Sequence, residues 1–131
     1  MSTFSRAYSE RWRELQRNEA RVIALRDTPN MGRDIPECVT SHSGSQRLCS
    51  HPKARAFIRV DPLVAAAHQT PGVELVDMTA AFCGAETCDP VVGNVLVWRD
   101  SDHMTASYAR TIAPALEKVL APLVELSAPS R

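Results

Sequence analysis

The sequence lacks a net charge and any long hydrophobic run, and each absence excludes a class of partner. Fifteen basic and fifteen acidic side chains balance over the 131 residues, so the composition predicts no binding to nucleic acid or to an anionic membrane. The basic residues between Arg6 and Arg26 alternate with Glu10, Glu14 and Glu19, which is typical of a solvated helix face. No apolar run approaches the roughly 20 residues that cross a bilayer, so we expect no membrane span in this chain.

A secretory signal is also missing, although the cysteines indicate an oxidising compartment. The N-terminal segment lacks the apolar stretch of a signal peptide, so we expect the chain to be cytoplasmic if it is expressed alone. The four cysteines form two local pairs in turn-rich segments, Cys38 with Cys49 and Cys83 with Cys88, and this spacing suits disulfides. Disulfides persist mainly outside the cytoplasm. The two expectations agree if the chain is part of an exported architecture.

The same cysteines have an alternative chemistry, because thiolates and imidazoles are also zinc ligands. Four ligands are available either from all four cysteines or from Cys38, His42, Cys49 and His51. The spacing of the second set matches none of the usual zinc-binding patterns. We therefore predict disulfides and no metal or cofactor, with zinc as the alternative.

Three stretches have the apolar periodicity of helices. Tyr8, Trp12 and Leu15 recur at helical spacing, which predicts a helix over residues 5–19 with this stripe in the core. Two further helices are expected on the same grounds: residues 53–69, interrupted at Asp61-Pro62, and residues 105–124, capped by Thr105.

Short apolar runs between these stretches predict strands. Val22–Leu25 shows no polar alternation, which is typical of a parallel strand covered on both faces, and Val73–Met78 is expected to be the next strand. Residues 91–98 contain a Gly-Asn step and predict a β-hairpin, whereas residues 30–52 are expected to be irregular. The order of the elements predicts an α/β fold. Two parallel strands would be only half of a sheet, since such strands need neighbours on either side.

The strongest chemical signal lies directly before the last predicted helix. Asp100 and His103 are three residues apart, so one turn of backbone can hold the carboxylate against the imidazole. Such a carboxylate fixes the tautomer of a histidine that acts as a general base. Two other interpretations stay open: Asp102 as the partner of His103, or a structural cap beside a surface histidine.

Arg26 and Asp27 are possible pocket residues. They follow the first predicted strand at its carboxyl end, where open α/β sheets bind their ligands. A purely structural turn is the alternative for this pair.

Taken together, these motifs resemble a known family. The matching segments are V-I-A-L-R-D-T-P (22–29), I-P-E-C (35–38), F-C (82–83), Cys88 and V-G-N-V-L-V-W-R-D-S-D-H-M-T (92–105). They resemble the C-terminal part of the SGNH domain that follows the membrane-spanning acyltransferase-three domain in bacterial cell-envelope O-acyltransferases, particularly actinobacterial ones. The resemblance covers about residues 5–122.

The resemblance implies a flavodoxin-like three-layer α/β sandwich, of which residues 1–124 would form a C-terminal part. The composition of the last residues predicts a disordered tail over residues 125–131. It implies a Ser-His-Asp site that moves acyl groups onto or off hydroxyls, with Asp100 as the orienting carboxylate and His103 as the base. It also implies local disulfides, an extracytoplasmic and membrane-tethered location, and an acyl donor and a sugar hydroxyl as partners.

The nucleophile block of that family does not occur here. The tripeptide Gly-Asp-Ser is absent, and the serines at 41, 43, 45 and 50 lie in a turn-forming loop without a strand-to-helix elbow. We expect a chain that is inactive alone and supplies the Asp-His part of a site completed by an N-terminal half. The alternative is a non-enzymatic truncated remnant, or a small interaction protein that dimerises or binds a partner through the exposed edge of Val22–Leu25.

Overall fold

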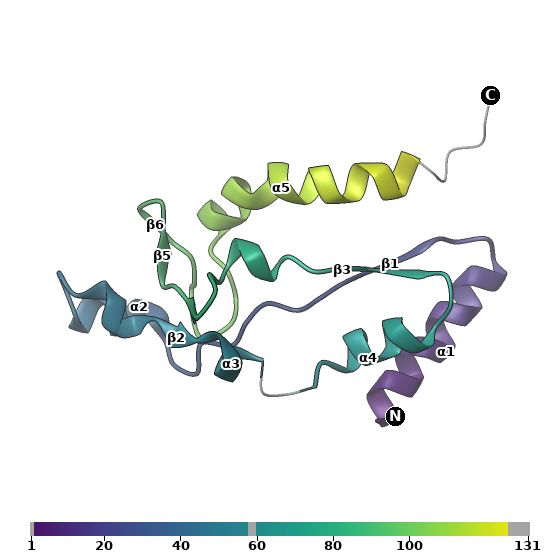
Figure 1. Cartoon of the computed structure of the whole chain (residues 1–131), viewed down its shortest axis with the longest axis horizontal. Helices are drawn as coiled ribbons and strands as arrows, with labels where there is room; N and C mark the ends of the chain where they lie inside the picture. The colour runs from purple at the N-terminus through teal and green to yellow at the C-terminus, as the bar shows by residue number, and fades with distance from the viewer. Residues whose placement is uncertain (1, 58–59, 126–131) are drawn as a thin grey trace. The chain divides into compact units, whose positions relative to one another are not determined.

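The computed structural model describes residues 2–57 and 60–125, and these divide into two compact units. The first unit holds residues 2–27, 60–77 and 119–125, and the second holds residues 28–57 and 78–118. Figure 1 labels helices and strands of both units where there is room. Parallel and antiparallel pairs occur together with helices, so the chain has the α/β fold that the sequence predicts.

The first unit contains the parallel strand pair. Strands β1 (Val22–Leu25) and β3 (Val73–Val76) align in register, and both strands were predicted. Helices α1 (Thr3–Arg17) and α4 (Pro62–Gln69) pack against them. The core of this unit consists of small and apolar side chains: Trp12, Val22, Ala24, Ala66 and Ala67. On β1 the burial alternates, so Leu25 is 46% exposed while Val22 and Ala24 are buried.

The buried face of α1 differs from the predicted stripe. Trp12 is buried and Leu15 is partly buried, but Tyr8 is 41% exposed, so its assignment to the core is wrong. Ser9 is buried instead, with its hydroxyl oxygen 2.9 Å from Thr70 Oγ1. Thr70 Oγ1 also donates to the Ala66 carbonyl oxygen at 2.8 Å. A small hydroxyl side chain at this position lets α1 and α4 approach closely, which a tyrosine would prevent.

The second unit is built from short elements around an aromatic core. Trp98 and Tyr108 both lie against Phe82, with ring centroids 5.4 and 5.9 Å apart. The Trp98 indole N–H donates to the Asp89 carbonyl oxygen, and the Tyr108 hydroxyl donates to that of Ala81. The elements are α2 (Ile35–Ser41), η1 (Gln46–Cys49), β2 (His51–Pro52), α3 (Lys53–Ala56), η2 (Thr79–Ala81), β4 (Thr87–Cys88), β5 (Val91–Val92) and β6 (Val95–Leu96).

Helix α2 lies in the segment that the sequence predicted to be irregular. The Asp34 carboxylate accepts the backbone N–H of Glu37 at 2.8 Å and caps the helix, and Pro36 occupies its first turn. An aspartate followed three residues later by a glutamate is a helix-start signal. The loop composition of the surrounding residues hid this signal.

The remaining elements follow the predictions closely. The stretch expected at 53–69 is divided into α3 and α4, with Asp61 as the cap of α4. The hairpin β5–β6 turns at Gly93 and Asn94, both with positive φ, as a tight two-residue turn requires. Helix α5 (Ala106–Glu125) begins after Thr105, whose hydroxyl oxygen accepts the N–H of Tyr108. The predicted tail beyond residue 125 lies outside the described residues.

Two disulfides connect parts of the second unit. Cys38 of α2 is bonded to Cys49 of η1, and Cys83 is bonded to Cys88 of β4, which are the two predicted pairs. His51 and Cys88 are also paired in the β2–β4 ladder, so η1, β2 and β4 form one linked segment. Within residues 2–57 and 60–125, no helix is both long and apolar enough to cross a bilayer.

Candidate active site

Asp100 and His103 form a carboxylate–imidazole pair in a tight turn of the second unit. Asp100 Oδ1 accepts the backbone N–H of Asp102 at 3.0 Å and that of His103 at 2.7 Å. Asp100 Oδ2 lies 2.8 Å from His103 Nδ1. The carboxylate therefore uses one oxygen to build the turn and the other to hold the imidazole. Aspartate side chains favour such turns because they accept hydrogen bonds from the backbone N–H groups two and three residues ahead.

This geometry has consequences for both side chains. The backbone N–H groups of Asp102 and His103, together with the imidazole, hold the pKa of Asp100 well below its ordinary value. Asp100 is therefore ionised at neutral pH and accepts a hydrogen bond from Nδ1–H. The other ring nitrogen, Nε2, is then the one without a proton and can act as a base. The His103 side chain is 68% exposed, so a reacting group can approach it.

Asp102 also approaches the imidazole, but at a greater distance. Asp102 Oδ1 lies 3.4 Å from His103 Nδ1, against 2.8 Å for Asp100. The distances favour Asp100 as the main partner of His103. Asp102 nevertheless lies close enough to interact with the imidazole.

A loop of the same unit, residues 28–35, clamps this turn. The Thr28 hydroxyl donates to the Asp102 carbonyl oxygen at 2.6 Å, and the Met31 N–H donates to the Ser101 carbonyl oxygen at 2.7 Å. The Asn30 amide donates to Asp102 Oδ2 at 3.3 Å. The loop itself is anchored by three fully buried side chains: Pro29, Met31 and Ile35.

Sequence reasoning did not find Thr28 and Asn30. The available signal was their position directly after β1, at the edge of a sheet where functional loops gather. Arg26 and Asp27, which were predicted there, lie in the first unit. Arg26 Nη1 forms an ion pair with Asp77 Oδ2 at 2.8 Å, and the Asp27 N–H donates weakly to Asp61 at 3.4 Å. Their role as pocket residues stays a prediction.

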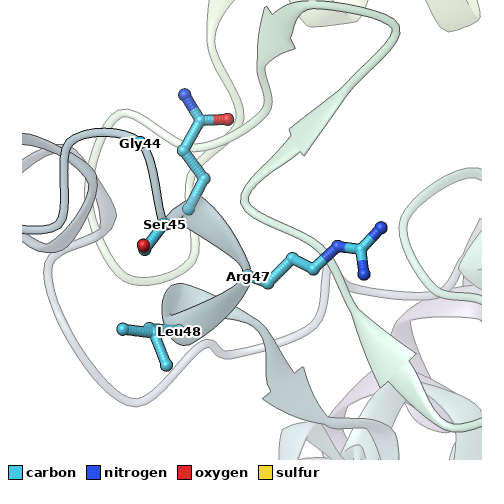
Figure 2. Close-up of a pocket in the computed structure, with 5 residues that line it drawn as sticks. Gly44, Ser45, Arg47 and Leu48 are labelled. Carbon is cyan, nitrogen blue, oxygen red and sulfur yellow. The ribbon is translucent and has the colours of Figure 1, made fainter.

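Two surface hollows lie in the second unit, and neither is lined by Asp100 or His103. One has a volume of about 550 Å³ and is formed by Gly44 and η1, where Ser45 and Arg47 are visible in Figure 2. The other has a volume of about 690 Å³, and Ser50 and Asp89 are among the residues that line it. The Ser50 hydroxyl donates to Asp89 Oδ1 at 3.0 Å, so it is not paired with an imidazole that could activate it.

The predicted alternative of a zinc site does not fit the sulfur atoms as they are bonded. Cys38 and Cys49 share a disulfide, so neither offers a thiolate ligand. His42 lies beside them, but its Nδ1 is directed to the Cys38 carbonyl oxygen at 2.9 Å. Asp100, Asp102 and His103 also bring possible ligand atoms within 4.8 Å of one another. Hydrogen bonds within the turn account for that cluster.

Comparison with known protein families identifies the family of the chain. The family model described as SGNH domain (fused to AT3 domains) matches residues 2–118. Because this match covers most of the chain, the chain belongs to the family of SGNH domains fused to AT3 domains. No curated protein and no solved structure matches the chain.

Proposed function

We propose that this chain supplies the acid–base half of a Ser-His-Asp acyl-transfer site. The family has an acyl-transfer or esterase-like domain. The observation that carries the proposal is the 2.8 Å contact between Asp100 Oδ2 and His103 Nδ1 on an exposed imidazole. In this proposal Asp100 orients the ring and His103 Nε2 moves the proton.

The chemistry has two balanced steps. His103 Nε2 takes the proton of a serine hydroxyl as the serine oxygen attacks an ester carbonyl, and the imidazolium gives that proton to the departing alcohol. The acyl group is then on the serine. In the second step His103 takes a proton from an acceptor hydroxyl, of a sugar or of water, which attacks the acyl-serine, and the proton returns to the serine oxygen. Asp100 stays ionised throughout and stabilises the imidazolium.

The serine of this site is not provided by a Gly-Asp-Ser motif within these 131 residues. The proposal therefore includes a second segment, in the same or a separate polypeptide, that brings the nucleophile and the oxyanion hole. Loss of the nucleophile from a triad lowers turnover by roughly 10⁶-fold, so residues 1–131 alone should be almost inert. The acceptor would be a carbohydrate hydroxyl of the cell envelope. The two disulfides favour the oxidising side of the membrane for such a reaction.

Complementation tests the proposal. The chain is mixed with, or fused behind, the N-terminal part of an SGNH domain of the same family that carries Gly-Asp-Ser, and hydrolysis of a short-chain nitrophenyl ester is followed. We expect activity in the mixture but in neither part alone, and its loss with His103→Ala. His68→Ala is the matched control, because His68 is exposed on α4 in the first unit. Activity that survives His103→Ala, or no activity with a properly assembled pair, would contradict the proposal.

A second candidate function rests on the two-stranded sheet. Within the described residues β1 is paired only with β3, and two strands are too few for a stable sheet by themselves. An unpaired strand edge is a template for another chain. This alternative, an interaction protein without catalysis, predicts dimers that Leu25→Lys or a proline at Ile23 would dissociate. Light scattering after size-exclusion chromatography distinguishes the two candidate functions. If the chain is a monomer, dimerisation through β1 is excluded, and the complementation assay decides.

A further inference from the structure

Two carboxylates, not one, face the same nitrogen of His103. Asp100 Oδ2 is 2.8 Å and Asp102 Oδ1 is 3.4 Å from Nδ1. The shorter contact is a hydrogen bond, whereas the longer one is an electrostatic contact at the limit of hydrogen bonding. Since Asp100 and Asp102 both lie close to Nδ1, both favour the tautomer that carries its proton there.

The position of Asp102 is built by a segment far away in the sequence. Its Oδ2 accepts the Asn30 amide at 3.3 Å, and its carbonyl oxygen accepts the Thr28 hydroxyl at 2.6 Å. Asn30 is itself oriented, because its amide oxygen accepts the N–H of Gly32 at 2.8 Å. The Ser101 hydroxyl donates to the remaining oxygen, Oδ1, at 3.1 Å. Both carboxylate oxygens and the main chain of Asp102 are therefore held.

These contacts orient the Asp102 carboxylate, whose side chain is 43% exposed. Asn30 fixes one oxygen of Asp102, which leaves Oδ1 on the side of the imidazole. The negative charge there disfavours the flipped orientation of the ring, because that orientation would bring an aromatic C–H in place of the Nδ1–H next to two carboxylates. A flipped ring would also remove Nε2 from the position that a base needs.

We infer that Asp102 is a positioning residue of the acid–base pair, held by Asn30 and Thr28, and that it shares with Asp100 the task of keeping the proton on His103 Nδ1. Its catalytic meaning rests on the proposed acyl-transfer function, whereas its effect on the imidazole does not. Asp102 does not touch the reacting atoms.

The test measures the ring tautomer of His103 in the isolated chain. Long-range proton–nitrogen spectra of ¹⁵N-labelled protein, recorded at a pH where imidazoles are neutral, report which ring nitrogen carries the proton. The wild-type chain should have its proton on Nδ1, and His68, which is exposed on α4, provides the internal reference. Asp100→Asn keeps the acceptor oxygen of the turn but removes one charge, so the share of the Nδ1–H form should fall.

The decisive comparison is made between variants that all carry Asp100→Asn. Adding Asp102→Asn to Asp100→Asn should lower the ratio of the Nδ1–H to the Nε2–H form by a further factor of about two to five. An effect of this size is expected for an exposed contact between charged groups. Asn30→Ala in the same background should give part of this change, although the carboxylate of Asp102 is retained. Glu37→Gln, which removes an exposed carboxylate from α2 in the same unit, should change nothing.

The outcomes separate this inference from the proposed function. An unchanged tautomer ratio after Asp102→Asn, with the backbone amide signals of Trp98 and Met104 preserved, would overturn the role of Asp102. If Asp102→Asn disturbs those signals, Asn30→Ala decides, since it leaves the turn sequence intact, and an unaltered ratio there overturns the inference as well. Neither measurement needs a serine or an ester, so a failed complementation assay would leave the result standing.

Discussion

Trp98 and Met104 face each other across an isolated antiparallel bridge, and this bridge closes the turn that carries Asp100 and His103. The Arg99 N–H donates to the His103 carbonyl oxygen at 2.9 Å just inside it. Because Trp98 is fully buried, one end of the turn is anchored in the aromatic core while its tip is exposed. An exposed imidazole on a turn that is anchored in the core suits acid–base chemistry, because such chemistry needs both access and a fixed position.

Replacing Asp100 should impair the complemented enzyme more than it impairs the fold. Asp100→Asn retains an oxygen for the backbone N–H groups of Asp102 and His103. Its NH₂ group, which is uncharged, then takes the place of the carboxylate oxygen next to Nδ1. We expect ester hydrolysis to fall by about 10⁴-fold, as in other triads whose carboxylate becomes an amide. Steady-state rates of Asp100→Asn and of the control Glu37→Gln measure the effect. A loss below tenfold would mean that Asp100 does not orient the base.

The acid stability of the chain should depend on Asp100. Its pKa is lowered in the folded state by the N–H groups of Asp102 and His103, relative to an ordinary value of 3.8. A lowered folded pKa contributes stability that is complete above the unfolded pKa and is lost as the pH falls towards the folded value. Wild type should therefore melt above Asp100→Asn at pH 5, and the margin should shrink as the pH falls below 3.8. Thermal melts between pH 5 and pH 2 measure it, and a margin that grows as the pH falls over this range would contradict the assignment.

The parts of the structure that could be predicted are those encoded by neighbouring residues. The strand β1, the Gly93-Asn94 hairpin and the contact of Asp100 with His103 each depend on a few consecutive side chains. The hydrogen bond between the loop of residues 28–35 and the turn that carries His103 could not be predicted in this way. Its two partners, Thr28 and Asp102, are 74 residues apart, and no periodicity relates them. Only the fold brings them together.

The exposed tyrosine of α1 illustrates the same limit. Tyr8 and Trp12 both fit an apolar stripe, but only Trp12 is buried in the unit where α1 packs against α4. The periodicity of apolar residues indicates which face of a helix is buried only to within one residue position. The actual contact surface of α1 is therefore centred on Ser9 and Trp12 and leaves Tyr8 at its margin.

Substitutions on α1 test that corrected face. Ser9→Leu places a large side chain between α1 and α4, and overpacking of this kind costs about 1–3 kcal/mol of the free energy of unfolding. Ser9→Ala removes only the hydrogen bond with Thr70 and should cost about 1 kcal/mol. Tyr8→Ala is the matched control and should cost less than Ser9→Leu, because Tyr8 is 41% exposed. Urea unfolding gives all three values, and a Tyr8 variant that is the least stable would restore the predicted stripe.

The disulfide between Cys38 and Cys49 should stabilise the candidate site as well as the fold. Cys38 lies on α2, and the N–H of Ile35, the first residue of that helix, donates to the Asp100 carbonyl oxygen at 3.4 Å. Removing the crosslink with Cys38→Ser and Cys49→Ser should lower the free energy of unfolding by about 2–3 kcal/mol through the lost loop constraint. It should also loosen α2, and with it one contact of the turn. Hydrogen exchange of the amides of Ile35, Asp102 and His103 measures this, with faster exchange expected at all three. Faster exchange in α2 alone would show that the loop of residues 28–35 holds the turn without help from the disulfide.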